Sequence, residues 1–363
     1  DARRLRDAIV QTVNATPYFA TTFFCMDGGW RQKPGIPRMT ADDVPIRDGA
    51  PSEEDRDAFC QPFDIESDVL FAFAIYAGDG ETTLLMHLHH ILIDHVGMKT
   101  FCDHVMAVYD DPGFVFDETR DYFDYVSELM SRQAELSRNG ERLLARLVRE
   151  AGRPAGQVCL TTRRGFSRRM LDLSGVRPLL EARGLSVSDL LLAAVGHAAS
   201  RALKTDKLLL HHVFSGRNDA RYFKTIGYFP ITLPLLFRDG PDLLNRIGRD
   251  VIESIERFSP FDDQQYLRLC GKSSVRLLIV YNYMEAFGGA PEDRYHLRDM
   301  RSNARLDDAK ASLITPQLEF NCLSSGDRGV VMLDYDAAVI SPQDVEKLFD
   351  AVAAFLNDQA EGT

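Results

Sequence analysis

Strand-like and helix-like patterns alternate along the whole of this 363-residue sequence, and this alternation constrains its fold more than any other feature. In the first half, two apolar runs of strand length at 69–76 and 83–89 are followed by helical spacing at 97–109 and 123–149. The second half alternates in the same way up to a final amphipathic helix after Ser341-Pro342. This order predicts an α/β fold with α+β character, in which helices pack against mixed sheets.

The remaining boundaries follow from proline, glycine and capping residues. A first helix is expected over about 2–14, a strand-rich run from Tyr18 to Met26, and loop over 28–62, which carries several prolines and many acids. In the second half we expect strands at 166–173, 207–214, 231–237, 276–283, 312–322 and 329–336. Helices are expected to end at Gly184, to run from an N-cap at Ser186 or Ser188 to Leu203, and to span 242–257.

One interruption of the alternation marks a domain boundary. The length alone favours roughly two domains. Periodicity breaks at Gly152–Gly156, where Pro154 stands between two glycines. We therefore predict an N-terminal lobe at 1–153 and a C-terminal lobe at 154–363. The chain opens inside a helical stripe that contains Leu5, so we expect that further sequence precedes it.

Composition excludes several classes of protein. The net charge of −12 and the pI near 5.3 repel phosphate backbones, so nucleic-acid binding is not expected. No apolar run reaches the roughly 20 residues that a membrane-spanning helix needs. The six cysteines stand singly, which favours neither a zinc ribbon nor a disulfide framework and is typical of a reducing cytosol. We therefore expect a cytoplasmic protein without membrane or nucleic-acid partners.

Four of the nine histidines fall within the nine-residue segment His87–His95, at a turn from an apolar strand to a helix. They could be polar residues satisfied at a strand end. They could bind metal, but three residues separate His90 from Asp94, and this spacing does not let the ligands converge, so no metal is expected. They could also serve acid/base catalysis, with one imidazole moving a proton and an Asp fixing the loop.

The segment His89-His90-Ile91-Leu92-Ile93-Asp94 resembles the HHxxxD core of the condensation domains of nonribosomal peptide synthetases, within the chloramphenicol-acetyltransferase-like group. The resemblance extends along the chain in family order: Pro62-Phe63-Asp64 upstream, and Gly216-Arg217-Asn218, Ile226-Gly227-Tyr228-Phe229, Thr232-Leu233-Pro234 and Ser259-Pro260-Phe261-Asp262 downstream. It implies two acetyltransferase-like lobes in a V-shaped pseudo-dimer, with the motif at their junction beside a tunnel.

The resemblance also implies an activity. Such a domain is an acyltransferase that forms an amide from an acyl or aminoacyl thioester on a carrier protein and an acceptor amine. The phosphopantetheine arm of the carrier delivers the substrate, and no tightly bound cofactor is implied. An enzyme that esterifies a hydroxyl, with coenzyme A or a carrier as donor, is one alternative. A catalytically degenerate domain that recruits a partner enzyme is another.

By position in the motif, His90 would be the residue that deprotonates or positions the acceptor, His89 would support it, and Asp94 would pair with Arg217 and hold the loop. We expect a bidentate pair, because a partly buried carboxylate needs a partner that is always charged. Candidates for the tunnel and the substrate site are His95, Gly97, Tyr228, Tyr281 and Asn282. For Tyr281 and Asn282, core packing is at least as strong an expectation.

Three departures from the family pattern mark an atypical member. His95 replaces the Gly that usually follows the motif Asp, Ala20 replaces an Arg, and Pro230-Ile231 replaces Val-Asn. They leave open whether specificity is altered or activity is lost. A basic run with eight arginines and Glu150 as its one acid spans 142–169. Within it, Arg163, Arg164 and Arg168 are candidates for docking an acidic carrier or a pantetheine phosphate, the alternative being a solvated surface.

Overall fold

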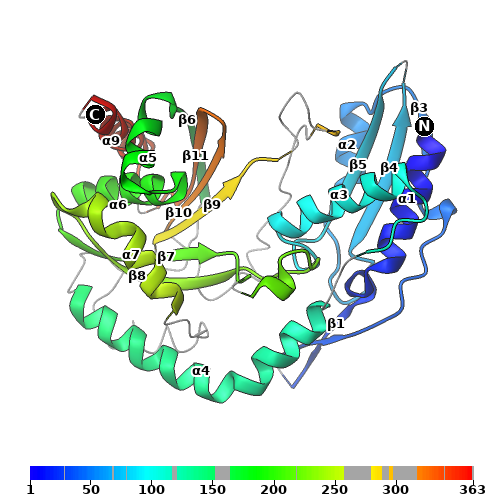
Figure 1. Cartoon of the computed structure of the whole chain (residues 1–363), viewed down its shortest axis with the longest axis horizontal. Helices are drawn as coiled ribbons and strands as arrows, with labels where there is room; N and C mark the ends of the chain where they lie inside the picture. The colour runs from blue at the N-terminus through cyan, green and yellow to red at the C-terminus, as the bar shows by residue number, and fades with distance from the viewer. Residues whose placement is uncertain are drawn as a thin grey trace. The chain divides into compact units, whose positions relative to one another are not determined.

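The computed structural model describes residues 1–27, 29–67, 69–78, 80–116, 121–151, 164–217, 219–256, 279–287, 294–296, 317–338 and 340–361. These residues form two compact units. Unit 1 contains Asp1–Ser131, Ser215–Pro230 and 294–296, and unit 2 contains the other described residues. Figure 1 labels their α-helices and most of their strands. No helix of the described chain is both long enough and apolar enough to cross a bilayer.

Unit 1 is built around a three-stranded sheet of order β3-β4-β5, in which β3 and β4 are parallel and β4 and β5 antiparallel. Its elements are α1 (Ala2–Ala15), η1 (Pro17–Ala20), β1 (Thr22–Met26), β2 (Gly29–Lys33), η2 (Ala41–Asp43), β3 (Ile46–Asp48), α2 (Glu53–Phe59), β4 (Phe71–Ala77), β5 (Thr82–Leu88), α3 (His95–Asp110), the start of α4 (Tyr122–Ala151) and η4 (Ala220–Tyr222).

The sequence explains the main packing of unit 1. Asp1 caps α1, because its carboxylate accepts from the amides of the first helical turn. The same helix buries Ile9 and Val13 at helical spacing. The rings of Phe73 and Phe101 stack 5.6 Å apart and join β4 to α3. This core holds the end of β5 and the start of α3 in fixed positions, and the histidine segment connects the two.

Unit 2 contains a six-stranded mixed sheet of order β6-β11-β10-β9-β7-β8, with β9 parallel to both of its neighbours. Its elements are β6 (Arg164–Asp172), η3 (Ser174–Val176), α5 (Arg177–Arg183), α6 (Val187–Leu203), β7 (Lys207–Phe214), β8 (Ile231–Arg238), α7 (Leu243–Glu256), β9 (Ile279–Glu285), β10 (Leu318–Ser325), β11 (Arg328–Asp336) and α9 (Pro342–Glu361). The expected α/β fold with mixed sheets is confirmed.

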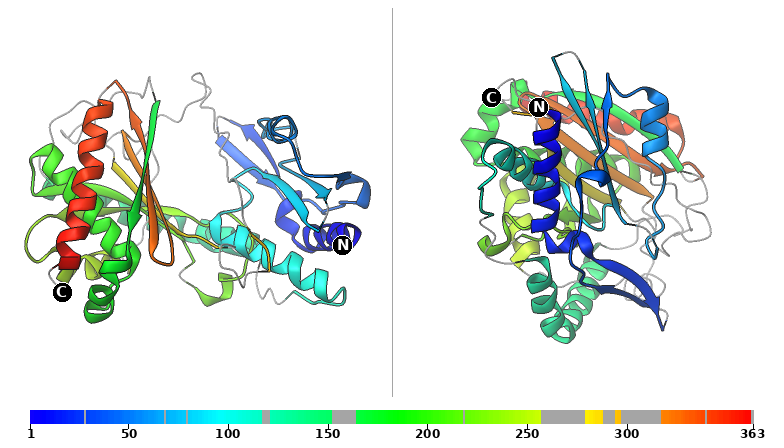
Figure 2. Two further views of the ribbon diagram at one scale, coloured as in Figure 1. Left: turned by 90° about the horizontal axis from the view of Figure 1, so that it is seen from above. Right: turned by 90° about the vertical axis from the view of Figure 1, so that its right-hand side faces the viewer.

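Helices cover both faces of this sheet. On one face α6 and α9 pack side by side against the strands, as the red helix beside the sheet in Figure 2 illustrates. The middle of α6 is buried on all sides, which explains its continuous run of leucine and alanine. On the other face, Leu144 of α4 packs with Leu209, Leu236 and Val280 of β7, β8 and β9.

Several sequence-based boundaries need correction. The run from Tyr18 to Met26 begins as the turn η1 before β1, since Pro17 presets helical backbone at its start. The segment 28–62, expected to be loop, contains β2, β3 and α2. Its helix is fixed by a capping box between Ser52 and Asp55. The predicted lobe boundary at 153 lies outside the described residues and stays a prediction.

Candidate active site

The histidine segment connects β5, which ends at Leu88, to α3, which begins at His95. Asp94 is the N-cap of α3, and its Oδ1 accepts a hydrogen bond from the Gly97 amide at 2.6 Å. Its own amide donates to the Gly227 carbonyl at 3.0 Å. A carboxylate at this position also opposes the positive end of the helix dipole. The turn between strand and helix is therefore set by the motif aspartate.

Asp94 forms a buried ion pair with Arg217. The two side chains are 2% and 3% exposed, and Arg217 donates to Oδ2 through Nη1. The amide of Phe229 donates to the same oxygen at 3.1 Å. Since Oδ1 is occupied by Gly97, the pair is not bidentate as expected: the second terminal nitrogen of Arg217 donates to the Thr225 carbonyl at 3.0 Å.

Segment 215–230 fits against the motif because of two glycines. Gly216 has φ +72°, and a Cβ atom there would overlap the carbonyl oxygen of Phe229. A Cβ atom at Gly227 would overlap the ring of Tyr122. The guanidinium of Arg217 lies 4.0 Å above the centre of the Phe229 ring, which adds a cation–π contact to the ion pair. Through these contacts the Asp94 carboxylate joins the start of α3 to segment 215–230.

His90 differs from Asp94 in being exposed. Its Nδ1 lies 2.7 Å from the Ile93 carbonyl oxygen. A carbonyl oxygen only accepts, so Nδ1 carries the proton and the neutral ring keeps its lone pair on Nε2. The ring of Tyr228 meets it edge-on, with centroids 5.2 Å apart. The loop therefore presents a basic nitrogen with a defined tautomer.

The two neighbouring histidines are used within the fold. His89 accepts a hydrogen bond at Nδ1 from the Ile91 amide at 3.1 Å. Burial, followed by the nearby His90 and His87, lowers its pKa. The His87 ring stacks on Phe63 at 4.1 Å, and burial lowers the pKa of His87 as well. Both rings thus favour the neutral form, and His89 supports the loop from inside.

The other candidates of unit 1 lie in three different environments. His95 is the first residue of α3 and is half-buried. Gly97 is buried, and a Cβ atom there would lie 3.3 Å from the Gly227 carbonyl oxygen, which makes it a packing position. Tyr228 is 38% exposed beside His90. Their assignment to a tunnel stays a prediction.

The candidates of unit 2 need one correction. Tyr281 has no exposed surface, and its hydroxyl donates to the Ser188 carbonyl at 2.7 Å. Tyr281 is therefore a core residue, which agrees with the expectation of core packing and not with a place on an open surface. Asn282 is half-buried and donates to the Asn321 side chain at 3.0 Å. Arg164 and Arg168 lie exposed on β6.

Two residues and one segment that carry the family resemblance or the docking prediction fall outside the described residues: Arg163, Asn218 and the Ser259–Asp262 segment. Metal binding also stays untested. Among the residues that the structure describes, no group of three or more His, Cys, Asp or Glu side chains has the arrangement of a metal site.

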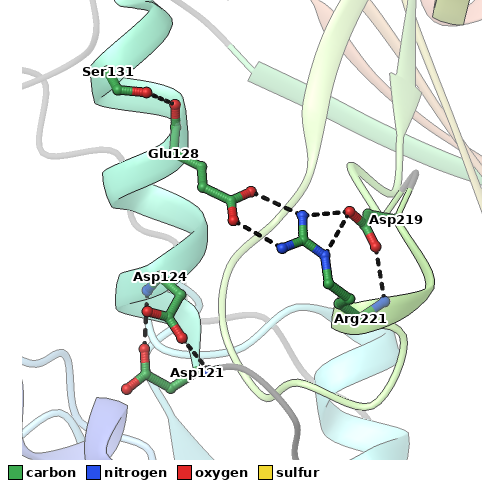
Figure 3. Close-up of polar contacts among 6 residues, drawn as sticks. All are labelled: Asp121, Asp124, Glu128, Ser131, Asp219 and Arg221. Carbon is green, nitrogen blue, oxygen red and sulfur yellow. Dashed lines mark hydrogen bonds and ion pairs between the residues drawn. The ribbon is translucent and has the colours of Figure 1, made fainter.

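Sequence reasoning did not single out the polar contacts that anchor segment 215–230 to α4. Arg221 reaches both carboxylate oxygens of Glu128, at 3.1 and 3.2 Å, and also contacts Asp219 (Figure 3). One turn earlier, Asp124 of α4 and Asp121, which directly precedes α4, cap the start of the helix with reciprocal hydrogen bonds. Sequence reasoning also missed Tyr18 and Tyr122, whose hydroxyls donate to the carbonyls of Ile91 and Tyr228. Buried tyrosines are ordinary core residues in a sequence pattern, so no signal separated them.

Comparisons with known proteins identify the family of the chain. The family model described as "Condensation domain" matches residues 1–276. Surfactin synthase subunit 1 of Bacillus subtilis (strain 168) is 26% identical over 286 residues, which is 73% of this chain. The chain spans only 8% of the length of that relative.

Solved structures share the fold over nearly the whole chain. The SgcC5 protein of Streptomyces globisporus matches with a TM-score of 0.73 at 14% identity, covering 99% of this chain and 89% of that one. The first condensation domain of the calcium-dependent antibiotic synthetase, in complex with a substrate analogue, matches with a TM-score of 0.71 at 17% identity, covering 99% and 88%. At such identities the likeness concerns the fold alone.

Proposed function

The chain belongs to the condensation-domain family of nonribosomal peptide biosynthesis, and from this premise we propose that it forms an amide between a carrier-bound acyl thioester and an acceptor amine. His90 is the residue to which we assign the proton transfer. Asp94 and Arg217 are the pair to which we assign the shape of the loop. His89 supports the loop from its buried side.

The observation that carries this proposal is the hydrogen bond from His90 Nδ1 to the Ile93 carbonyl at 2.7 Å. It leaves the Nε2 lone pair of an exposed residue available to accept a proton. General base catalysis needs a nitrogen that is both unprotonated and held in one orientation. The hydrogen bond to the Ile93 carbonyl holds the ring in one orientation, and in the neutral ring it leaves the lone pair on Nε2.

The proposed chemistry balances without a further reactant. The amine nitrogen attacks the thioester carbonyl carbon, and a C–N bond forms as the C–S bond breaks. Nε2 of His90 accepts the proton that the amine loses. The leaving thiolate of the phosphopantetheine arm then takes a proton, which the imidazolium can return. No metal or tightly bound cofactor enters this scheme.

Asp94 takes no part in the proton transfer in this proposal. Its two oxygens accept from two amides and from Arg217, and its side chain is 2% exposed. All of these partners belong to the protein itself, so the carboxylate serves as a structural group. Its contribution is to fix the loop that carries His90.

For the carrier partner we propose β6 as a docking surface. Arg164 and Arg168 alternate along this edge strand with Phe166 and Met170, which are 59% and 66% exposed. Exposed apolar side chains next to two cations suit an acidic helix of a carrier protein. Arg168→Glu should raise the KM for a carrier-bound donor and leave the KM for a small thioester donor unchanged.

A reconstitution tests the proposed function directly. The protein is incubated with an acyl-loaded carrier and, in separate reactions, with amine and hydroxyl acceptors, and the products are identified by mass spectrometry. We expect an amide that is absent when His90→Ala replaces the wild type. An ester formed in preference would contradict the proposed acceptor. The recruitment function would be favoured instead if no acceptor gave a product and the protein bound a partner enzyme.

A further inference from the structure

Two tyrosine hydroxyls contact the loops around His90. Tyr18, from η1, is 4% exposed, and its hydroxyl donates to the Ile91 carbonyl at 3.1 Å. Ile91 directly follows His90 in the chain. The first contact therefore fixes the backbone on the C-terminal side of the histidine.

The second contact fixes the residue that faces the imidazole. Tyr122, the first residue of α4, is 8% exposed, and its hydroxyl donates to the Tyr228 carbonyl at 2.5 Å. Its ring lies directly over Gly227. The ring of Tyr228 in turn meets the His90 ring edge-on, at 88° between the planes. Tyr122 therefore fixes the packing partner of the imidazole.

The two tyrosines form one unit, which we call the tyrosine pair (Tyr18 and Tyr122). Their ring centroids lie 4.2 Å apart, so that the two rings pack directly against each other. Burial raises the pKa of both phenols far above the range in which proteins are assayed. Both hydroxyls thus remain neutral donors at any working pH.

We propose that the tyrosine pair positions His90 for the reaction, by holding the backbone beside it through Tyr18 and its ring neighbour Tyr228 through Tyr122. This inference rests on the proposed function of His90. The two tyrosines are positioning residues, because their hydroxyls are used by backbone carbonyls and neither touches the reacting atoms.

The expected effect follows from the geometry. Replacing either tyrosine by phenylalanine keeps the ring packing and removes the donor from a carbonyl of the loop. A displacement of about 1 Å at a reacting group can reduce a rate by up to 10²-fold, so we expect each variant to lower kcat by about tenfold. The KM for the acceptor should not change, since substrate contacts are retained.

The experiment compares Tyr18→Phe and Tyr122→Phe with the matched control Tyr125→Phe. Tyr125 is equally buried, at 8%, and its ring lies 5.9 Å from that of Tyr122 in the same cluster. Steady-state kinetics give kcat and KM for each variant, and nitrogen NMR of selectively labelled histidine reports the tautomer and exchange of the His90 ring. Melting temperatures show which variants remain folded.

We expect lower kcat and a mixture of His90 tautomers in Tyr18→Phe and Tyr122→Phe, with neither change in Tyr125→Phe. Unchanged kcat and unchanged His90 signals in both test variants would overturn the proposal, and so would an equal loss of kcat in the control. If the wild type forms no product, the proposed function fails, whereas the NMR comparison still decides whether the tyrosine pair holds His90.

Discussion

The chain contains the same dipeptide twice, in two different environments. His89-His90 follows the last residue of β5 and enters a loop. His211-His212 lies in the middle of β7, within the six-stranded sheet, where the two residues are 1% and 7% exposed. Burial lowers the pKa of both to about 4. In the first pair His90 is exposed and His89 is half-buried, whereas both residues of the second pair are buried in a core.

The difference shows that the position of the dipeptide relative to the strand decides whether its imidazoles are buried or accessible. In β7 the ring of His212 stacks on buried Tyr281 at 6.0 Å, and its neighbour faces the opposite side of the sheet. Both rings are held neutral inside the protein. At the end of β5, the backbone leaves the sheet, and His90 is exposed with its Nδ1 hydrogen-bonded.

The largest effect is expected from a substitution that removes the ion pair holding the loop of His89-His90. Asp94→Ala leaves Arg217 as a buried charge without its carboxylate, and such a loss typically costs about 3–5 kcal/mol. We expect chemical denaturation to show this decrease in the free energy of unfolding, together with loss of activity. The control Asp103→Ala removes an exposed ion pair with Lys99 and should cost less than about 1 kcal/mol. Equal stability of the two variants would contradict the structural role of Asp94.

The second prediction concerns pH and tests the buried pair. A folded pKa near 4 against an unfolded value near 6.5 means that only the unfolded chain takes up a proton as the pH falls below 6.5. Stability is therefore full above pH 6.5 and is lost as the pH falls toward 4, by about 2 kcal/mol per histidine at pH 5.

Replacing His212 by phenylalanine removes its share of this loss. Comparing the free energy of unfolding at pH 7.5 and pH 5 in wild type and His212→Phe gives the difference. A variant that loses as much stability on acidification as the wild type would show that His212 is not held neutral in the core.

The smallest effect is expected at Arg221, four residues after Arg217 in the same segment. Its side chain is 42% exposed, although it contacts Glu128 and Asp219. Exposed pairs gain little, because water solvates the separated charges almost as well. We expect Arg221→Ala to leave the melting temperature and kcat unchanged within error, and a clear decrease in either would mean that the anchoring of this segment to α4 is stronger than its exposure indicates.

Much of the fold could be predicted because its elements are strongly periodic. β7 was placed at its observed bounds. α6 was expected to run to Leu203 from an N-cap at Ser186 or Ser188, and the cap is Ser186. The failures lie in the polar segment before Pro62. There, β2 and β3 are short strands with little burial, and α2 buries no residue. Periodicity reflects burial, so elements without a buried face leave almost no pattern.

The candidate site could be predicted only in part, because some of its contacts leave no pattern in the sequence. The motif and Arg217 could be found by resemblance, and the ion pair is present. That Arg217 contacts the carboxylate through one nitrogen could not be foreseen. This geometry depends on the backbone amides of Gly97 and Phe229, and backbone amides leave no signal in a sequence. Tyr281 was equally open to two interpretations, because an aromatic residue at a strand gives the same pattern in a core and on a binding surface.

The central claim is that His90, and not the buried histidine pair, carries the chemistry. Turnover of an acyl-loaded carrier and an amine by His90→Ala, measured beside its melting temperature, tests this most directly. The account predicts a loss of turnover of roughly 10²–10⁴-fold with an unchanged melting temperature. Full turnover by a folded His90→Ala variant would contradict it.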